Sequence, residues 1–143
     1  MIFVNDIMSR KVKTLDASST IFEAANLMDK LKIGSVVITN RGAPVGIVTE
    51  GDVSRAVAKK LDVENVKLRA VMSQPLITAK REMRLEEAAK LMADANVKKL
   101  PVVDYGKLVG MVTQTDIVGA SFSLVTSLKE MVRARYSPPD FEP

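Results

Sequence analysis

The sequence predicts a mixed α/β (α+β) fold in which a strand–helix–strand–strand–helix unit, βαββα, occurs twice before a C-terminal helical extension. When the chain is aligned with itself at an offset of 64 residues, 15 of the 51 pairs from Asp6/Ala70 to Ala56/Ala120 are identical. Each copy also shows the same order of helical and extended patterns. We therefore divide the chain into repeat 1 (1–58), a connector (59–64), repeat 2 (65–122), and a C-terminal helix with a loose tail (123–143).

Each repeat begins with a short extended stretch, at 12–15 and at 76–79, and a helix follows. In repeat 1, Thr20 and Glu23 have the spacing of a capping box, which predicts that the helix starts there. Arg84 replaces the threonine in repeat 2, so that cap is lost. The apolar stripes of the two helices are Ile21, Ala24, Ala25, Met28 and Leu31, and Leu85, Ala88, Ala89, Met92 and Ala95.

The second half of each repeat predicts a β-hairpin and a helix. An apolar run leads into a glycine turn, at 40–42 or 104–106, and a further strand follows. The next helix begins near Glu50 in repeat 1 and near Gln114 in repeat 2. Residues 123–135 can extend that last helix with an apolar face. The proline-rich segment 136–143 cannot be helical and is expected to be loose.

Composition excludes several classes of function. The 143 residues include neither cysteine nor histidine, which removes thiolate nucleophiles, cysteine-bound zinc and Ser–His–Asp hydrolysis. The chain is 47% hydrophobic, yet no apolar run approaches the ~18 residues of a membrane span, and its start is unlike a signal peptide. We expect a cytoplasmic protein without membrane contact. The net charge of +4 favours anionic partners only weakly, and 4% aromatic residues argue against nucleic-acid stacking.

A threonine and an aspartate recur where the last strand of each repeat meets the following helix. The motifs are Gly46-Ile-Val-Thr49-Glu-Gly-Asp52 and Gly110-Met-Val-Thr113-Gln-Thr-Asp116. The two polar side chains are about one helical turn apart, so they point to the same side. Helix N–H groups and a hydroxyl suit a phosphate, and a carboxylate can accept from both hydroxyls of a ribose. The preceding glycine would allow close backbone approach. The same spacing is also an ordinary N-cap, and the two interpretations are compatible.

The doubled βαββα unit with this Gly-h-Val-Thr-x-x-Asp motif (h apolar) resembles the CBS domain, named after cystathionine β-synthase. The resemblance covers residues 1 to about 122, and two units in tandem look like a Bateman module. It implies that the units pack through their sheets about a pseudo-two-fold axis, with adenosine compounds in the clefts and homodimers common. It also implies that Asp52 and Asp116 contact ribose, and that Thr49 and Thr113 lie on the phosphate side.

The resemblance points to further candidates at the start of the middle strand. Lys98 and Lys99 match positions where family members often carry basic residues that contact phosphates, although a solvated pair at a strand edge is equally plausible. Gly34 and Ser35 occupy these positions in repeat 1, so we expect repeat 2 to be the better phosphate site. Arg55, one turn after the first aspartate, could compensate, whereas its counterpart in repeat 2 is a glycine.

Thr14 and Thr78 match the family's first strand, whose backbone often contacts the adenine edge, but their side chains fit ordinary strand positions equally well. The methionines, including Met8 and Met72, are expected to pack in the core rather than line a ligand pocket.

These observations predict a regulatory module rather than an enzyme. The ligand would be AMP, ADP, ATP or S-adenosylmethionine, no cofactor would be required, and the signal would pass in trans to an effector protein. A structural protein-interaction module with degenerate ligand sites is the main alternative. Nucleic acid is a weaker candidate partner because the sequence contains no zinc motif and no aromatic platform.

Overall fold

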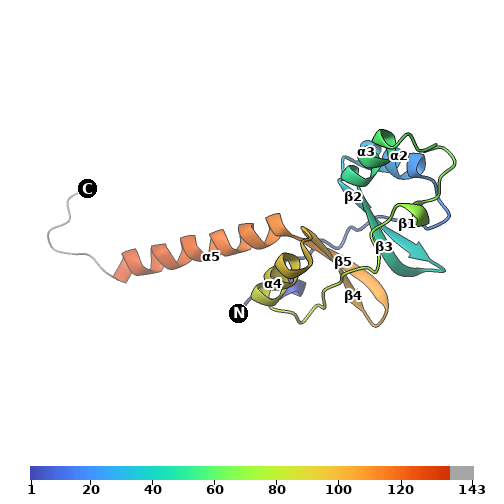
Figure 1. The fold of residues 1–143 in the computed structure, drawn as a ribbon. Helices are drawn as coiled ribbons and strands as arrows, with labels where there is room; N and C mark the ends of the chain where they lie inside the picture. The colour runs from blue at the N-terminus through green and yellow to red at the C-terminus, as the bar shows by residue number, and fades with distance from the viewer. Residues whose placement is uncertain (136–143) are drawn as a thin grey trace.

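The computed structural model describes residues 1–135 and contains two α/β units joined by exchanged segments (Figure 1). A single-turn helix, α1 (Val4–Ile7), precedes the first unit. The elements of repeat 1 are β1 (Thr14–Asp16), α2 (Ile21–Leu31), β2 (Ser35–Asn40), β3 (Ala43–Thr49) and α3 (Glu50–Ala58). The strands form one sheet in the order β1-β2-β3, in which β1 is parallel and β3 antiparallel to β2.

Repeat 2 follows the same plan with one strand fewer. Its elements are the 3-10 helix η1 (Leu68–Ala70), α4 (Leu85–Ala95), β4 (Lys99–Asp104), β5 (Lys107–Thr113) and α5 (Gln114–Arg135). The prediction of a strand at 76–79 is wrong, because Ala79 alone in that stretch is paired, through one parallel bridge to Val102. In repeat 1 the N–H of Val37 donates to the Lys13 carbonyl at 3.1 Å. The equivalent residue of repeat 2 is Pro101, which has no N–H to donate, so this ladder bond is lost.

The helix starts agree with the sequence. Thr20 caps α2: its side chain accepts from the Glu23 N–H, and the Glu23 carboxylate accepts from the Thr20 N–H. Arg84 makes no side-chain cap on α4. The apolar stripes were placed too widely at two positions, since Leu31 is 39% exposed and Ala89 is exposed. Leu31 is the last residue of α2, and Lys32 follows it in a left-handed conformation that ends the helix.

Both hairpins close through the predicted glycine turns. Arg41 and Gly42 have φ of 51° and 80°, and Tyr105 and Gly106 have φ of 49° and 76°. Two successive positive φ values are typical of the tight turns whose twist matches that of the flanking strands.

The N-terminal segments of the two repeats are exchanged in space. Residues 3–9, the first arm, lie against repeat 2, where Val4 and Met8 join the core and Ser9 exchanges backbone hydrogen bonds of 2.9 and 2.8 Å with Met111. Residues 67–73, the second arm, lie against repeat 1, where Leu68 is fully buried and Ser73 pairs with Ile47. Each repeat therefore buries its core with a segment that belongs, by sequence, to the other.

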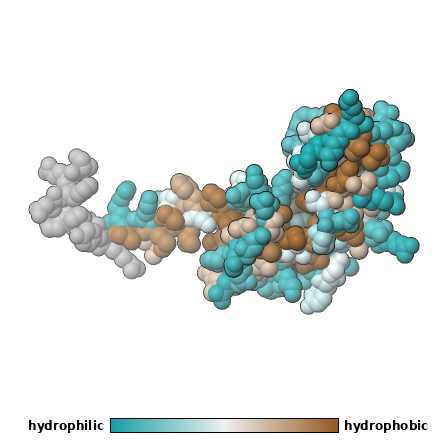
Figure 2. Space-filling model, in the orientation of Figure 1, coloured by the Kyte–Doolittle hydropathy of each residue, from teal (hydrophilic) through white to brown (hydrophobic). Residues whose placement is uncertain are grey.

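Helix α5 projects away from both units (Figure 1). The predicted helical extension through 135 is confirmed, and Figure 2 shows hydrophobic residues along its exposed surface. The exposed apolar residues of α5 are Val118, Phe122, Leu124, Val125, Leu128, Met131 and Val132. Despite its length of 22 residues, neither α5 nor any other helix within 1–135 has the apolar run needed to cross a bilayer. The expectation of a loose tail at 136–143 lies outside the described residues.

Candidate ligand site

The alternation of the central strands decides which side chains face the other repeat. Val36 and Ile38 of β2 are buried in the core beneath α2 and α3, whereas Val37 is buried on the opposite face of the sheet. Strands β3 and β5 of the two sheets contact each other. Because side chains alternate along a strand, Ser35 and Thr49 share the face of Val37. The ends of these strands therefore open towards the other repeat.

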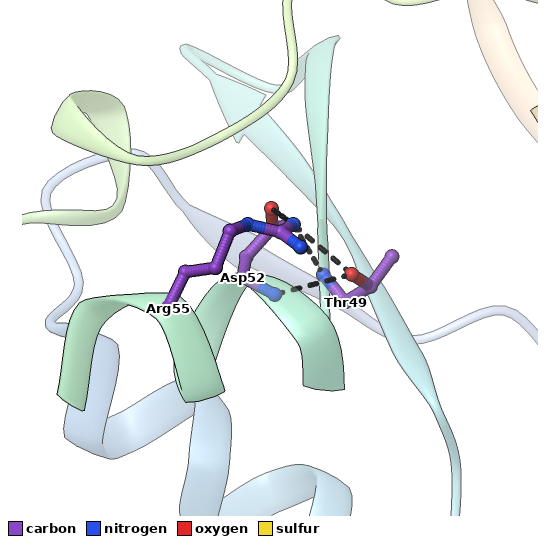
Figure 3. Close-up of polar contacts among 3 residues, drawn as sticks. All are labelled: Thr49, Asp52 and Arg55. Carbon is purple, nitrogen blue, oxygen red and sulfur yellow. Dashed lines mark hydrogen bonds and ion pairs between the residues drawn. The ribbon is translucent and has the colours of Figure 1, made fainter. Parts of the chain in front are cut away.

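The first Thr–Asp pair forms a complete N-terminal cap on α3 (Figure 3). The Thr49 backbone N–H donates to Asp52 Oδ2 at 2.8 Å, and its hydroxyl donates to the same oxygen at 3.2 Å. The Asp52 N–H donates to Thr49 Oγ1 at 3.4 Å. The other oxygen, Oδ1, accepts from Arg55 Nη2 at 2.6 Å, so both oxygens of Asp52 already have protein partners.

Burial makes the Asp52–Arg55 pair asymmetric. The Asp52 side chain is only 10% exposed, whereas that of Arg55 is 64% exposed. Figure 3 shows the arginine folded back over the start of α3 towards Thr49. The guanidinium end of the pair lies largely in solvent, so another anion can reach the arginine there, whereas the carboxylate stays mostly buried.

The second Thr–Asp pair has the same cap but no arginine. The Thr113 N–H donates to Asp116 Oδ2 at 2.9 Å, and the Asp116 N–H donates to Thr113 Oγ1 at 3.1 Å. Gly119 stands where repeat 1 has Arg55. Within residues 1–135, no side chain donates to Asp116 Oδ1 or forms an ion pair with it, which leaves that oxygen available to a ligand.

The strand register brings some of the other candidates to these caps. Ser35 lies opposite Thr49, and Lys99 lies opposite Thr113. Lys98, one step along, lines a hollow of about 340 Å³ between α4 and α5, so the adjacent lysines face different regions. Gly34 contributes its carbonyl, which accepts from the Glu50 N–H at 3.2 Å.

The two first-strand threonines lie further away. Thr14 is opposite Val37, on the far side of β2 from Thr49. Thr78 lines a hollow of about 500 Å³ between the two hairpins, together with Val45 and Val103. Neither threonine makes a side-chain hydrogen bond among the described residues.

Sequence reasoning missed why the motif contains glycine. A Cβ at Gly46 would lie 2.7 Å from the Met72 sulfur, and one at Gly110 would lie 2.7 Å from the Met8 sulfur and 2.8 Å from the Ser9 carbonyl. The close approach is thus that of the exchanged arms rather than of a ligand. The identical Met-Ser pairs in the internal alignment were the available signal.

Within the described part of the chain, no three Asp or Glu residues are grouped so that they could hold a metal ion. The two caps therefore offer hydroxyl, carboxylate and backbone N–H groups, which are chemically suited to ribose and phosphate.

The fold and the paired strand–helix caps together define a tandem pair of α/β domains. The CBS domain model matches residues 4–59 and 68–123. An uncharacterized protein from Methanopyrus kandleri, MK0525, is 40% identical over 133 residues, 91% of this chain and 68% of its own. The chain therefore belongs to the CBS domain family, which confirms the resemblance drawn from the motifs.

Two solved structures show what similar pairs bind. The CBS domain pair of protein MJ0100, in complex with 5′-methylthioadenosine and S-adenosyl-L-methionine, has a TM-score of 0.79 and 30% identity, covering 87% of this chain and 98% of that one. The CBS domain protein PAE2072 from Pyrobaculum aerophilum, complexed with AMP, has a TM-score of 0.78 and 29% identity, covering 87% and 99%.

Proposed function

We propose that this chain is a cytoplasmic regulatory module that binds AMP, ADP, ATP or S-adenosylmethionine between its repeats and signals in trans. The observation that carries the proposal is the duplicated Thr–Asp cap at the strand–helix junctions. Each cap presents a carboxylate and a threonine at the N-terminus of a helix, on the side that faces the other repeat. Structural neighbours with AMP, 5′-methylthioadenosine and S-adenosylmethionine support the ligand class.

The mechanism follows from the position of the sites between two units. A ligand that contacts both repeats binds best to one relative arrangement and shifts the population towards it. Helix α5 starts at Gln114, directly within the second cap, and extends out of the module. A change at Asp116 would therefore move a long exposed helix, which we propose as the surface that contacts the effector or a second copy in a homodimer.

A structural interaction module with degenerate sites is the second candidate, and the first repeat favours it. Both oxygens of Asp52 are engaged within the protein, so capping alone accounts for the pair there. Catalysis is not expected from either candidate.

Calorimetric titration with AMP, ATP and S-adenosylmethionine distinguishes the candidates. Asp52→Asn and Asp116→Asn keep an oxygen to cap the helix but remove the carboxylate that would accept from a ribose diol. Glu23→Gln is the matched control, because it changes the capping carboxylate of α2 in the same way. We expect binding in the low micromolar range, stoichiometry lowered by at least one aspartate variant, and unchanged binding in the control.

The opposite outcome is equally specific. If no ligand binds up to millimolar concentration while the aspartate variants only lose stability, the Thr–Asp pairs are caps and the structural module is correct. Turnover of ATP by the wild-type protein would refute both candidates.

A further inference from the structure

Lys98 and Lys99 are adjacent at the start of β4, but their side chains face different regions. The Lys99 side chain reaches repeat 1. A Cβ at Gly34, at the entry to β2 of repeat 1, would lie 3.2 Å from the Lys99 ammonium nitrogen. The same point is 4.0 Å from Glu50 Oε2, on the first residue of α3. Although Lys99 belongs to repeat 2 by sequence, its charge therefore lies beside the start of α3 in repeat 1.

Arg55 brings a second cation to the same end of α3. Its guanidinium bonds Asp52 Oδ1 at 2.6 Å, and a Cβ at Gly51 would lie 3.3 Å from Arg55 Nη1 and 3.6 Å from Thr49 Oγ1. Two cations and the two carboxylates of Glu50 and Asp52 thus gather around this cap, and their formal charges cancel.

The equivalent end of α5 has none of these cations. In the internal alignment, Ser35 corresponds to Lys99, Gly119 to Arg55 and Gln114 to Glu50. Only the carboxylate of Asp116 remains among these four positions, so their formal charge is −1. Lys98 lies next to this end of α5 and lines the hollow between α4 and α5 with Gln114, but no ion pair joins it to Asp116 within residues 1–135.

This difference in charge makes the two caps complementary to different ligands. A phosphate near α3 would attract Arg55 and Lys99 and release Asp52 Oδ1 to accept from the ribose. A nucleoside without phosphate would have to displace the arginine and supply no anion in return. At α5, the available Oδ1 of Asp116 can accept from a ribose directly, while a phosphate would be repelled by the carboxylate.

We propose that the two sites select ligands by charge. The Asp52 site takes an adenine nucleotide with a 5′-phosphate, completed by Lys99 from the other repeat, and the Asp116 site takes an adenosine derivative without phosphate. The inference rests on the proposed function and specifies its ligands. It reverses the expectation from the sequence, which assigned the better phosphate site to repeat 2 because both lysines lie there.

The test uses AMP and 5′-methylthioadenosine, which share the nucleoside and differ at the 5′ position. Both are titrated by calorimetry, singly and with the other ligand saturating. We expect one molecule of each per chain without competition. Asp52→Asn should remove AMP binding alone, and Asp116→Asn should remove 5′-methylthioadenosine binding alone.

The two lysines provide a matched pair of variants. Lys99→Ser should weaken AMP by about tenfold, the usual effect of losing one charge-assisted contact, without changing the affinity for 5′-methylthioadenosine. Lys98→Ser removes the same charge one residue away and should leave both affinities unchanged. Arg55→Ala should weaken AMP and free Asp52, which opens a second site for 5′-methylthioadenosine.

Each contrary result has a distinct meaning. Loss of AMP binding in Asp116→Asn but not in Asp52→Asn would overturn the assignment, as would an effect of Lys98→Ser equal to that of Lys99→Ser. Binding of both ligands in competition at one site would overturn the inference but leave the proposed function intact. If neither ligand nor any other adenosine compound binds, the proposed function and the inference both fail.

Discussion

Gly110→Ala should destabilise the protein because the first arm leaves no room for a methyl group. The new Cβ would lie 2.7 Å from the Met8 sulfur and 2.8 Å from the Ser9 carbonyl oxygen. The methionine is only 8% exposed within the core of repeat 2. The carbonyl is held by the Met111 N–H at 2.8 Å. Since neither atom can move freely, either the arm or β5 must shift.

The magnitude follows from the known effect of overpacking. Inserting a methylene or methyl group into a well-packed core costs about 1–3 kcal/mol. For a chain of this length each kcal/mol lowers the melting temperature by roughly 2–4 °C, so a loss near 2 kcal/mol corresponds to roughly 4–8 °C. Thermal and urea unfolding measure the change. Faster hydrogen exchange at the Ser9 and Met111 amides would locate it at the arm.

Gly119→Ala is the matched control, because a Cβ there meets nothing within 4 Å. The same substitution in the interior of α5 should stabilise the helix by about 0.5–1 kcal/mol. Opposite signs for the two alanine variants are the expected result. If Gly110→Ala melts at or above the wild-type temperature, the first arm does not pack against repeat 2 as described.

Three further predictions concern other parts of the molecule. Thr20→Ala should lower the free energy of unfolding by about 1 kcal/mol, because it removes the side-chain cap of α2. Arg84→Thr should raise it by a similar amount, because α4 has no side-chain cap. Urea unfolding measures both changes, and changes of the same sign would contradict the argument. If α5 forms the homodimer contact, Leu128→Glu should reduce the mass in solution to that of one chain, 15.6 kDa. Light scattering measures the mass, and a variant that remains a dimer would refute the role of α5 in dimerisation. Ser18→Ala should raise the pKa of Asp16, which Ser18 holds below its usual 3.8 through side-chain and backbone hydrogen bonds. The stabilisation from these bonds is present above the usual pKa of Asp16 and is lost as the pH falls through its lowered pKa in the folded protein. The variant and the wild type should therefore have the same free energy of unfolding in strong acid. An unchanged NMR titration of Asp16 in the variant would contradict this argument.

Most secondary structure could be predicted because its causes are local. The cap at Thr20, the glycine turns and the helical stripes each depend on residues within a few positions of one another. The sequence wrongly predicted a first strand in repeat 2. Its loss could not be foreseen, because Pro101 removes a hydrogen bond from a segment more than twenty residues earlier in the chain. A proline without an N–H looks harmless in its own hydrophobic run.

The candidate site was predicted in part for the same reason. The Thr–Asp caps at α3 and α5 follow from a four-residue motif, and both form as the spacing indicates. The motif could not show that the Arg55 guanidinium bonds to the Asp52 carboxylate. Nor could it show that the side chains of Lys98 and Lys99 face different regions, or that Glu50 lies near Lys99. Those facts depend on strand alternation and on which face meets the other sheet.

The sequence by itself determined that this protein is a duplicated unit of the CBS type with a long final helix, since repetition, caps and turns can be recognised from the residues alone. Only the tertiary structure decided that the arms are exchanged, that Gly46 and Gly110 make room for them, and that Lys99 lies beside the cap of the other repeat. The physical reason is distance along the chain. These contacts join residues that are 26 positions apart at Gly46 and Met72, 65 at Gly34 and Lys99, and 102 at Gly110 and Met8, and packing between the two repeats brings them together.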